Sequence, residues 1–243
     1  MYLRILFEEG KGDLVAWIDQ EITVLPLESI ARKWKHEIFF EVPIEIGKEG
    51  VGTIEKGDIA YWPPGKALCL FYGFSQPYSP VIKLGALLGV PDLLATVEDN
   101  VKVRVDQYTD YGRHGEIARN LREVGLKAAS HTWEGDEYIA VLVEGANSRV
   151  GIEVSAEDFG FHAQTQPIAF FDNVPSTVAF VKTVAKDIYP TGVKLDVDEE
   201  GYLVLSGFFQ SVDELARGLK RMLSTYMYVE RSMISFYGVR RPV

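Results

Sequence analysis

The stretch GDIAYWPPGKALCLFYG, residues 57–73, decides the fold of the first half of the chain. Two runs rich in apolar and aromatic residues, 59–62 and 66–72, flank a turn at 63–65 made of two prolines and one glycine. Proline fixes φ at two successive positions and glycine permits positive φ, so the chain reverses within these three residues. The stretch therefore predicts a tight β-hairpin.

The residues around this hairpin continue a β-rich pattern. Further strands are expected at 1–7, 14–18, 36–43 and 101–105, together with one or two helical turns at 26–33. Strands thus outnumber helices over the first hundred residues. This imbalance predicts a β-domain at the start of the chain.

The strand expected at 36–43 has two unlike faces. Its alternating residues are Ile38, Phe40 and Val42 on one face and Glu37, Phe39 and Glu41 on the other. Because the first face is uniformly apolar, we expect it to point into the core. Phe39 on the second face then either lines a groove or sits at a partly covered edge.

The pattern changes to mixed α and β near residue 106. Helices are expected at 112–125, from a cap at Ser176 to residue 188, and from a capping box at Ser211 onward, with hairpins at 126–143 and 193–205. We therefore expect two domains, a β-barrel at residues 1–105 and a two-layer α+β domain at residues 106–243. A ferredoxin-like arrangement of the second domain is one option.

Composition excludes several classes of protein. The chain has 35 acidic and 25 basic residues, a net charge of -10, which argues against a nucleic-acid partner. No apolar run approaches the ~18 residues of a membrane span, and the amino terminus lacks a signal-peptide core, so we expect a cytoplasmic protein without a membrane partner. The single cysteine, Cys69, excludes an internal disulfide, and its leucine neighbours indicate a buried, inert thiol.

Three segments carry a resemblance to a known family. The motif GDIAYWPPGKALC at 57–69 resembles the small prokaryotic cyclophilin-like domain family, whose members are mostly of undetermined function. The segments WKHEIFFEVP at 34–43 and SPV at 79–81 are also similar to that family. The resemblance covers roughly residues 1–105 and implies a closed cyclophilin-like β-barrel with one or two short helices. It does not extend into residues 106–243.

The same resemblance raises the question of catalysis. Cyclophilins proper are prolyl isomerases that use an arginine on a Phe-His-Arg strand, and this chain contains no such string. Its nearest match, Phe161-His162-Ala163, lies in the other domain. We therefore favour a binding module, with peptidyl-prolyl isomerase as the alternative if Arg32, Lys35 or a residue of the second domain supplies the cation.

Aromatic residues near the hairpin are the candidate binding residues. We expect Phe39, Tyr61 and Trp62 to line a groove, with Phe71 beneath, that takes a peptide segment or a small apolar ligand. The other interpretation is that alternate aromatic residues fill the barrel and the rest are scattered on its surface.

Neither a metal nor a cofactor is expected. The four histidines form no pair at i, i+4 spacing, and His131 and His162 would share a metal site only if the fold brought them together with nearby acids. Otherwise they are unrelated loop histidines. The sequence also has no phosphate loop, no dinucleotide fingerprint and no nucleophile elbow.

The carboxyl end is rich in aromatic residues and methionine between residues 226 and 237. Such residues are enriched at association surfaces, so a homo-oligomer and a structural assembly protein are further alternatives. The competing interpretation is a final helix and strand that close the second domain's own sheet.

Overall fold

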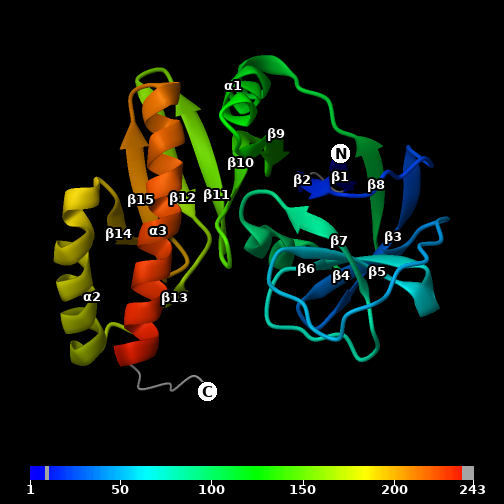
Figure 1. Ribbon diagram of the computed structural model, residues 1–243, viewed down its shortest axis with the longest axis horizontal. Helices are drawn as coiled ribbons and strands as arrows, with labels where there is room; N and C mark the ends of the chain where they lie inside the picture. Colours follow the sequence, from blue (N-terminus) through cyan, green and yellow to red (C-terminus); the bar gives the residue numbers. More distant parts are fainter. Residues whose placement is uncertain (9–10, 237–243) are drawn as a thin grey trace.

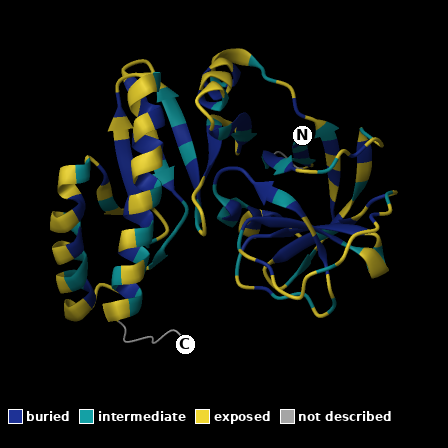
Figure 2. Ribbon diagram, in the orientation of Figure 1, coloured by how far each residue is buried: buried dark blue, intermediate teal, exposed yellow. Residues whose placement is uncertain are grey.

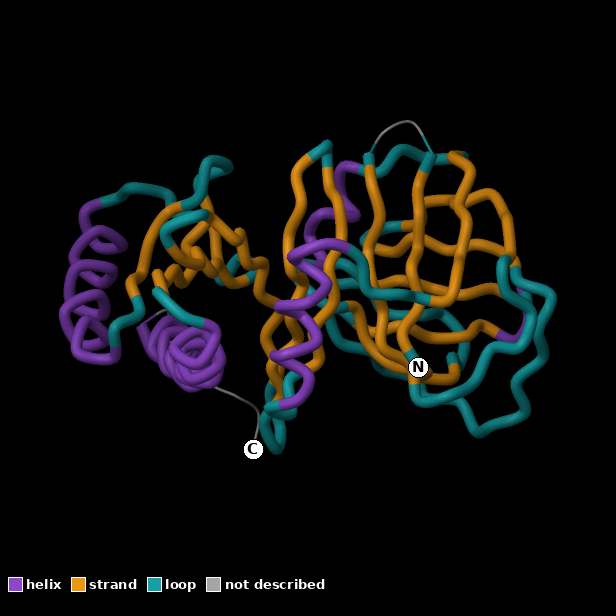
Figure 3. The backbone as a smooth tube through the Cα atoms, turned by 90° about the horizontal axis from the view of Figure 1, so that it is seen from above, coloured by secondary structure: helices purple, strands orange, loops and turns teal. Residues whose placement is uncertain are grey.

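The computed structural model describes residues 1–8 and 11–236 and has two parts, a barrel of strands beside a helix-covered sheet (Figure 1). The barrel strands are β1 (Tyr2–Phe7), β2 (Gly12–Ile18), β3 (Leu27–Trp34), β4 (Glu37–Glu41), β5 (Asp58–Trp62), β6 (Ala67–Phe71), β7 (Ile82–Leu87) and β8 (Val101–Gln107). They follow the order β1-β8-β3-β4-β6-β5-β7-β2, and β2 pairs with β1 to close the ring. All pairings are antiparallel, which confirms the expected closed β-barrel (Figure 3).

The predicted hairpin is β5 and β6, joined by the short 3-10 turn Pro63–Gly65. The residue that takes a positive φ is Lys66, at 45°, rather than Gly65. Gly65 is needed for a different reason, since a Cβ at this position would overlap the Trp62 ring. The turn therefore depends on close approach of the backbone to the indole.

The helical turns expected at 26–33 are wrong, because these residues form strand β3. Leu27, Ile30, Ala31 and Trp34 recur at helical spacing, which explains the mistaken prediction. β3 nevertheless pairs with β8 on one side and with β4 on the other. Two ladders of interstrand hydrogen bonds outweigh the weak local preference.

The interior of the barrel is a single apolar core (Figure 2). Ile38 and Phe40 of β4 point into it, as the alternation predicted. Tyr61 of β5 also belongs to this core, with only 2% of its surface exposed. The outward-facing residues of the same strands are therefore free to build a site.

The rest of the chain forms an α+β region. Its elements are α1 (Gly112–Glu123), β9 (Lys127–Trp133), β10 (Asp136–Glu144), β11 (Arg149–Glu157), β12 (Gly160–Thr165), β13 (Ala169–Phe170), α2 (Pro175–Ile188), β14 (Lys194–Val197), β15 (Tyr202–Phe209) and α3 (Val212–Phe236). β9, β10, β11 and β12 form an antiparallel meander. β15 pairs with β12 at the edge of this meander, and β13 and β14 pair with β15. A four-strand meander differs from the βαββαβ order of a ferredoxin-like domain, so that option is wrong.

The helices and the barrel cover opposite faces of the α+β sheet. Ala128, Ile139 and Val141 belong to the core shared with the helices. Their neighbours along the strands, Ala129 and Ala140, instead join a small cluster with β2 and β7 of the barrel. The two large cores are thus separate, while the division of the chain into domains at residue 105 stays a prediction.

Several details of the α+β region differ from expectation. α2 begins with Pro175 after Val174, so Ser176 does not cap it. Residues 156–167, for which the sequence left a loop and a strand equally open, contain strand β12. The cap at Ser211 is confirmed, because its hydroxyl accepts a hydrogen bond from the Glu214 amide at 3.3 Å.

The last described element, α3, continues to Phe236 with no closing strand, and Tyr237 lies outside the described residues. Tyr226 and Met233 are buried against the sheet. Homo-oligomerisation through this segment stays a prediction. Among the helices that the structure describes, none combines the length and the apolar character needed to cross a membrane.

Candidate ligand-binding site

The outer face of the barrel carries the candidate site, on strands β3, β4, β6 and β5. Side chains of a strand alternate between its two faces, so every second residue leaves the core. The outward residues are Arg32 and Trp34 of β3, Glu37 and Phe39 of β4, Cys69 and Phe71 of β6, and Ala60 and Trp62 of β5. Aromatic rings predominate among these residues, and Glu37 is the only carboxyl among them.

The strand register brings these residues into rows. Arg32 lies opposite Phe39, which lies opposite Cys69. Trp34 lies opposite Glu37, which in turn lies opposite Phe71. The two-residue turn that joins β3 to β4 sets this register, and Lys35 within it takes a positive φ of 55°.

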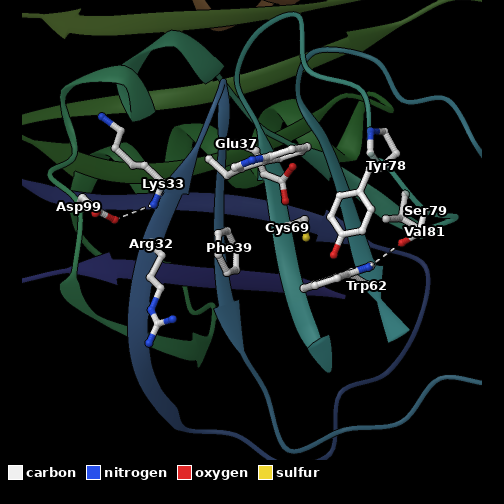
Figure 4. Close-up of a pocket in the computed structure, with 12 residues that line it drawn as sticks. Arg32, Lys33, Glu37, Phe39, Trp62, Cys69, Tyr78, Ser79, Val81 and Asp99 are labelled. Carbon is white, nitrogen blue, oxygen red and sulfur yellow. Dashed lines mark hydrogen bonds between the residues drawn. The ribbon is translucent and has the colours of Figure 1, made fainter. Parts of the chain in front are cut away.

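A cavity of about 290 Å³ opens on this face, under the segment that connects β6 to β7 (Figure 4). Trp34, Glu37, Phe39 and Trp62 line it from the strands, and Tyr78 leans over them from the connecting segment. A concave, mostly apolar pocket with few polar groups is the usual form of a small-ligand site. We call this cavity the outer pocket.

Tyr78 connects two walls of the outer pocket. Its ring lies edge-on to Trp34, with centroids 5.8 Å apart, and edge-on to Trp62, at 5.6 Å. The Trp62 indole N–H donates to the Ser79 hydroxyl at 2.9 Å and is thereby satisfied. Tyr78 itself is 74% exposed, so the pocket is open to solvent at this side.

Gln76 ties the segment that carries Tyr78 to the segment between β4 and β5. The side-chain amide of Gln76 accepts from the Ile54 N–H and donates to the Ile54 carbonyl, each at 3.2 Å. Val51 and Val81 add an antiparallel bridge beside it. These contacts hold the segment that carries Tyr78 over the outer pocket, although the segment forms no strand.

Glu37 is the polar group at the inner end of the outer pocket and is only 6% exposed. Burial raises the pKa of this carboxyl, while a hydrogen bond with the Cys69 thiol and the charge of Lys35 act against the rise. No ion pair to Glu37 occurs within residues 1–8 and 11–236. Its partner inside the protein is thus a neutral thiol.

The other two buried acids are paired, in contrast to Glu37. Asp13 binds Arg4 at 2.8 Å. Asp58 binds both Lys83 and Arg149, each at 2.8 Å. Buried charges are normally compensated in this way, because an isolated ion loses its hydration without gaining a partner.

The Cys69 thiol beside Glu37 is buried, as the sequence predicted. Burial is the main factor that raises the pKa of Cys69 far above its usual value, and the adjacent Glu37 carboxyl raises it further. The thiolate is therefore not formed at neutral pH. Cys69 contributes a hydrogen-bond donor to the site rather than a nucleophile.

The four predicted binding residues occupy three different places in the structure. Phe39 and Trp62 line the outer pocket. Phe71 is fully buried behind them, packed with Cys69, as the position beneath the groove implied. Tyr61 faces the barrel interior, where its hydroxyl donates to the Ile44 carbonyl at 2.7 Å, so it does not line the pocket.

Sequence reasoning missed Trp34, Glu37 and Tyr78 as pocket residues. Glu37 shares the outward face of Phe39 by simple alternation, so its signal was present in the sequence. Trp34 becomes its neighbour only through the strand pairing of β3. Tyr78 is more than thirty positions away from Glu37, and nothing local predicts their approach.

The two histidines considered for a metal site lie on different strands. His131 is fully buried on β9 and pairs with Glu153 at 2.7 Å, whereas His162 is exposed on β12. Residues 1–8 and 11–236 include no group of three or more His, Cys, Asp or Glu side chains suited to a metal ion. The loop placement expected for both histidines is wrong, since each belongs to a strand.

Comparison with known proteins identifies the class of the barrel. Residues 1–106 match the family model described as Cyclophilin-like. Through this part of the chain, the protein belongs to the cyclophilin-like family, as its hairpin motif predicted. The match ends where the α+β region begins.

Two solved structures are also similar to the chain. One is the solution structure of the hypothetical protein AF2241 from Archaeoglobus fulgidus, which is 31% identical and covers 44% of this chain and 95% of its own, with a TM-score of 0.37. The other is McbB in complex with tryptophan, 12% identical, covering 50% of this chain and 54% of its own, with a TM-score of 0.37. No curated protein matches the chain.

Proposed function

We propose that the protein is a cyclophilin-like binding module that takes a peptide segment or a small apolar ligand in the outer pocket. The observation that carries this proposal is the cavity of about 290 Å³ walled by Trp34, Trp62 and Tyr78. Its size is near the lower end of the range typical of small-ligand sites. One apolar side chain or one small ring system fits such a volume.

The aromatic walls supply the affinity in this proposal. Aromatic rings bury large apolar areas and favour edge-to-face contacts, and Tyr78 already makes such contacts with both indoles. The Trp62 N–H is bound to Ser79, so its ring offers apolar surface without an unsatisfied donor. Trp62 is therefore the expected hot spot of binding.

The test compares two neighbouring residues of β5 that face opposite sides. Trp62→Ala removes a wall of the outer pocket, and we expect it to weaken binding of a capped apolar peptide at least about tenfold. Tyr61→Phe is the matched control, because it removes only the buried hydroxyl that bonds to Ile44. We expect Tyr61→Phe to cost about 1 kcal/mol of stability and to leave binding unchanged.

Calorimetric titration of the wild type and both variants measures these affinities. Retention of full affinity by Trp62→Ala, in a variant that melts cooperatively, would rule out the outer pocket as the binding site. Loss of affinity in Tyr61→Phe alone would point to the barrel interior instead.

A second candidate, peptidyl-prolyl isomerisation, is favoured by the position of Arg32. This arginine lies opposite Phe39 and lines the outer pocket, where a cation can polarise a bound amide. Under this candidate, a peptide with one Xaa-Pro bond isomerises at a rate that rises linearly with protein, and Arg32→Met abolishes the effect. Uncatalysed isomerisation takes tens to hundreds of seconds, so a weak acceleration is measurable. Binding without acceleration supports the binding module alone.

A further inference from the structure

We infer that the ligand of the outer pocket carries an alkylammonium group, which Glu37 binds while the aromatic walls surround its apolar body. This inference rests on the proposed function and specifies the chemical class of the ligand. It follows from the charge balance of the buried acids and from the arrangement of the rings around Glu37.

The first argument is the missing counter-charge. The buried carboxyls of Asp13 and Asp58 each hold a basic partner within the protein, and Glu37 holds none within the described residues. An ionised carboxyl at this depth requires a cation, because burial removes the water that would otherwise stabilise it. The outer pocket is the open side of Glu37, so a ligand can supply that cation.

The second argument is the set of rings beside Glu37. Ammonium groups are attracted to the faces of indole and phenol rings. Trp34, directly opposite Glu37, already holds the ammonium of Lys35 over its ring at 4.0 Å. Lys35 does not line the outer pocket, so it leaves the pocket side of Trp34 and the Glu37 carboxyl accessible.

The other charges near the outer pocket do not occupy this position. The Lys33 ammonium donates to the Ala95 carbonyl at 2.8 Å, and Asp99 accepts from the Lys33 backbone N–H at 2.8 Å. Figure 4 shows the side chains of Lys33 and Arg32 extending away from the Glu37 carboxyl. The inner end of the pocket is therefore acidic, although its rim contains bases.

A primary ammonium suits Glu37 best. It donates charge-assisted hydrogen bonds of about 2.7–2.9 Å to a carboxylate and at the same time contacts aromatic faces. The carbon chain that bears it then lies among the rings of Trp62 and Tyr78. A lysine-like side chain of a peptide and a small arylalkyl amine both meet this description.

The experiment titrates the full chain with 2-phenylethylammonium and with 2-phenylethanol, a neutral probe of similar size. We expect the ammonium to bind at least about tenfold tighter than the alcohol. Glu37→Gln should abolish this preference while keeping affinity for the alcohol. Glu41→Gln is the matched control, because Glu41 lies on the same face of β4 but is exposed and outside the pocket lining, and it should keep the preference.

The outcomes separate the inference from the proposed function. Equal affinity for the two probes, or tighter binding of the anion phenylacetate, overturns the ammonium inference and leaves an apolar binding site. If none of the three probes binds up to about 10 mM and the capped apolar peptide does not bind either, both the ammonium inference and the proposed function are wrong.

A pH titration of the wild type provides a test that needs no variant. Acidification protonates Glu37, so affinity for the ammonium should fall at low pH while affinity for the alcohol stays constant. Of the groups facing Glu37, Cys69 remains protonated in this range. The other charged side chains around the pocket are Arg32, Lys33, Lys35 and Asp99. Glu37→Gln serves as the control for all of these groups. A fall of the same size in Glu37→Gln would contradict the inference.

Discussion

At the scale of single residues, Glu37 is the most unusual group in the barrel. It is buried, it faces a pocket, and its hydrogen-bond partner is the Cys69 thiol. Residues that serve binding are often suboptimal for stability, because the groups they need arrive only with the ligand. A stability measurement therefore tests the assignment of Glu37 without any ligand.

We predict that Glu37→Gln is more stable than the wild type at neutral pH, by about 1 kcal/mol, because it removes a buried charge with no counter-ion. The folded pKa of Glu37 is raised, mainly by burial, so the folded protein holds this proton more tightly than the unfolded chain. Protonated Glu37 therefore contributes to folding stability at pH values below its pKa in the unfolded chain. This contribution is lost as the pH rises through the pKa of Glu37 in the folded protein.

The difference in melting temperature between Glu37→Gln and wild type should therefore grow as the pH rises from about 4, the ordinary pKa range of a glutamate, to neutral pH. Thermal unfolding followed by circular dichroism measures it. A variant that is less stable than the wild type across this range would show that Glu37 has a stabilising partner.

The sequence predicts the position of some single residues and not of others. Phe39 and Trp62 could be placed on outward faces from the sequence, because strict alternation and a local turn fix the direction of their side chains, and their role in binding stays a prediction. Tyr61 was assigned to the groove although it precedes Trp62 directly. Adjacent residues of a strand point to opposite faces, so the two could not both line one pocket.

At the scale of elements, the segment between β6 and β7 completes the outer pocket. It has no regular structure of its own, and Gln76 is the side chain that attaches it to the backbone of Ile54, in the segment between β4 and β5. Tyr78 lies two residues beyond this attachment, so we expect the attachment to position its ring over the two indoles. We therefore expect the segment between β6 and β7 to be ordered before the ligand binds.

We predict that Gln76→Ala weakens ligand affinity about tenfold, since Tyr78 must then be ordered at the moment of binding. Phe74→Ala is the control on the same segment, because Phe74 is 87% exposed and should leave affinity unchanged. Calorimetry with the capped apolar peptide measures both. Equal affinity in Gln76→Ala and wild type would show that Tyr78 is positioned by other contacts.

Elements differ in how well the sequence predicts them. The β5–β6 hairpin was predicted from a turn of three residues, because proline restricts the backbone locally. β3 was mistaken for helical turns, because its apolar residues have helical spacing and its strand character comes from pairing with β8 and β4. Local signals thus identify the hairpin, and only tertiary contacts identify β3.

At the scale of the whole molecule, an ion cluster around the buried Asp58 carboxyl joins the barrel to the α+β sheet. Asp58 of β5 pairs with Lys83 of β7 and with Arg149 of β11, and Arg149 also donates to the Lys56 carbonyl at 2.6 Å. No pattern in the sequence predicted this junction, because its members are far apart along the chain. It holds the two cores in one arrangement.

We predict that Arg149→Ala lowers the free energy of unfolding by about 2 kcal/mol, because Asp58 then keeps only one of its two bases in a buried position. Arg113→Ala is the control, since the Arg113–Asp158 pair is exposed and should contribute less than about 0.5 kcal/mol. Urea denaturation measures both variants. Equal stability of the two would contradict the role assigned to the junction.

The most direct test of the binding proposal observes the four tryptophan side chains by nuclear magnetic resonance during titration with 2-phenylethylammonium. Trp34 and Trp62 line the outer pocket, whereas Trp17 and Trp133 pack at the junction and in the barrel core. We predict that the indole N–H signals of Trp34 and Trp62 shift and saturate together while the other two stay in place. Saturable shifts confined to Trp17 and Trp133, or no shift at saturating probe, would contradict a ligand site in the outer pocket.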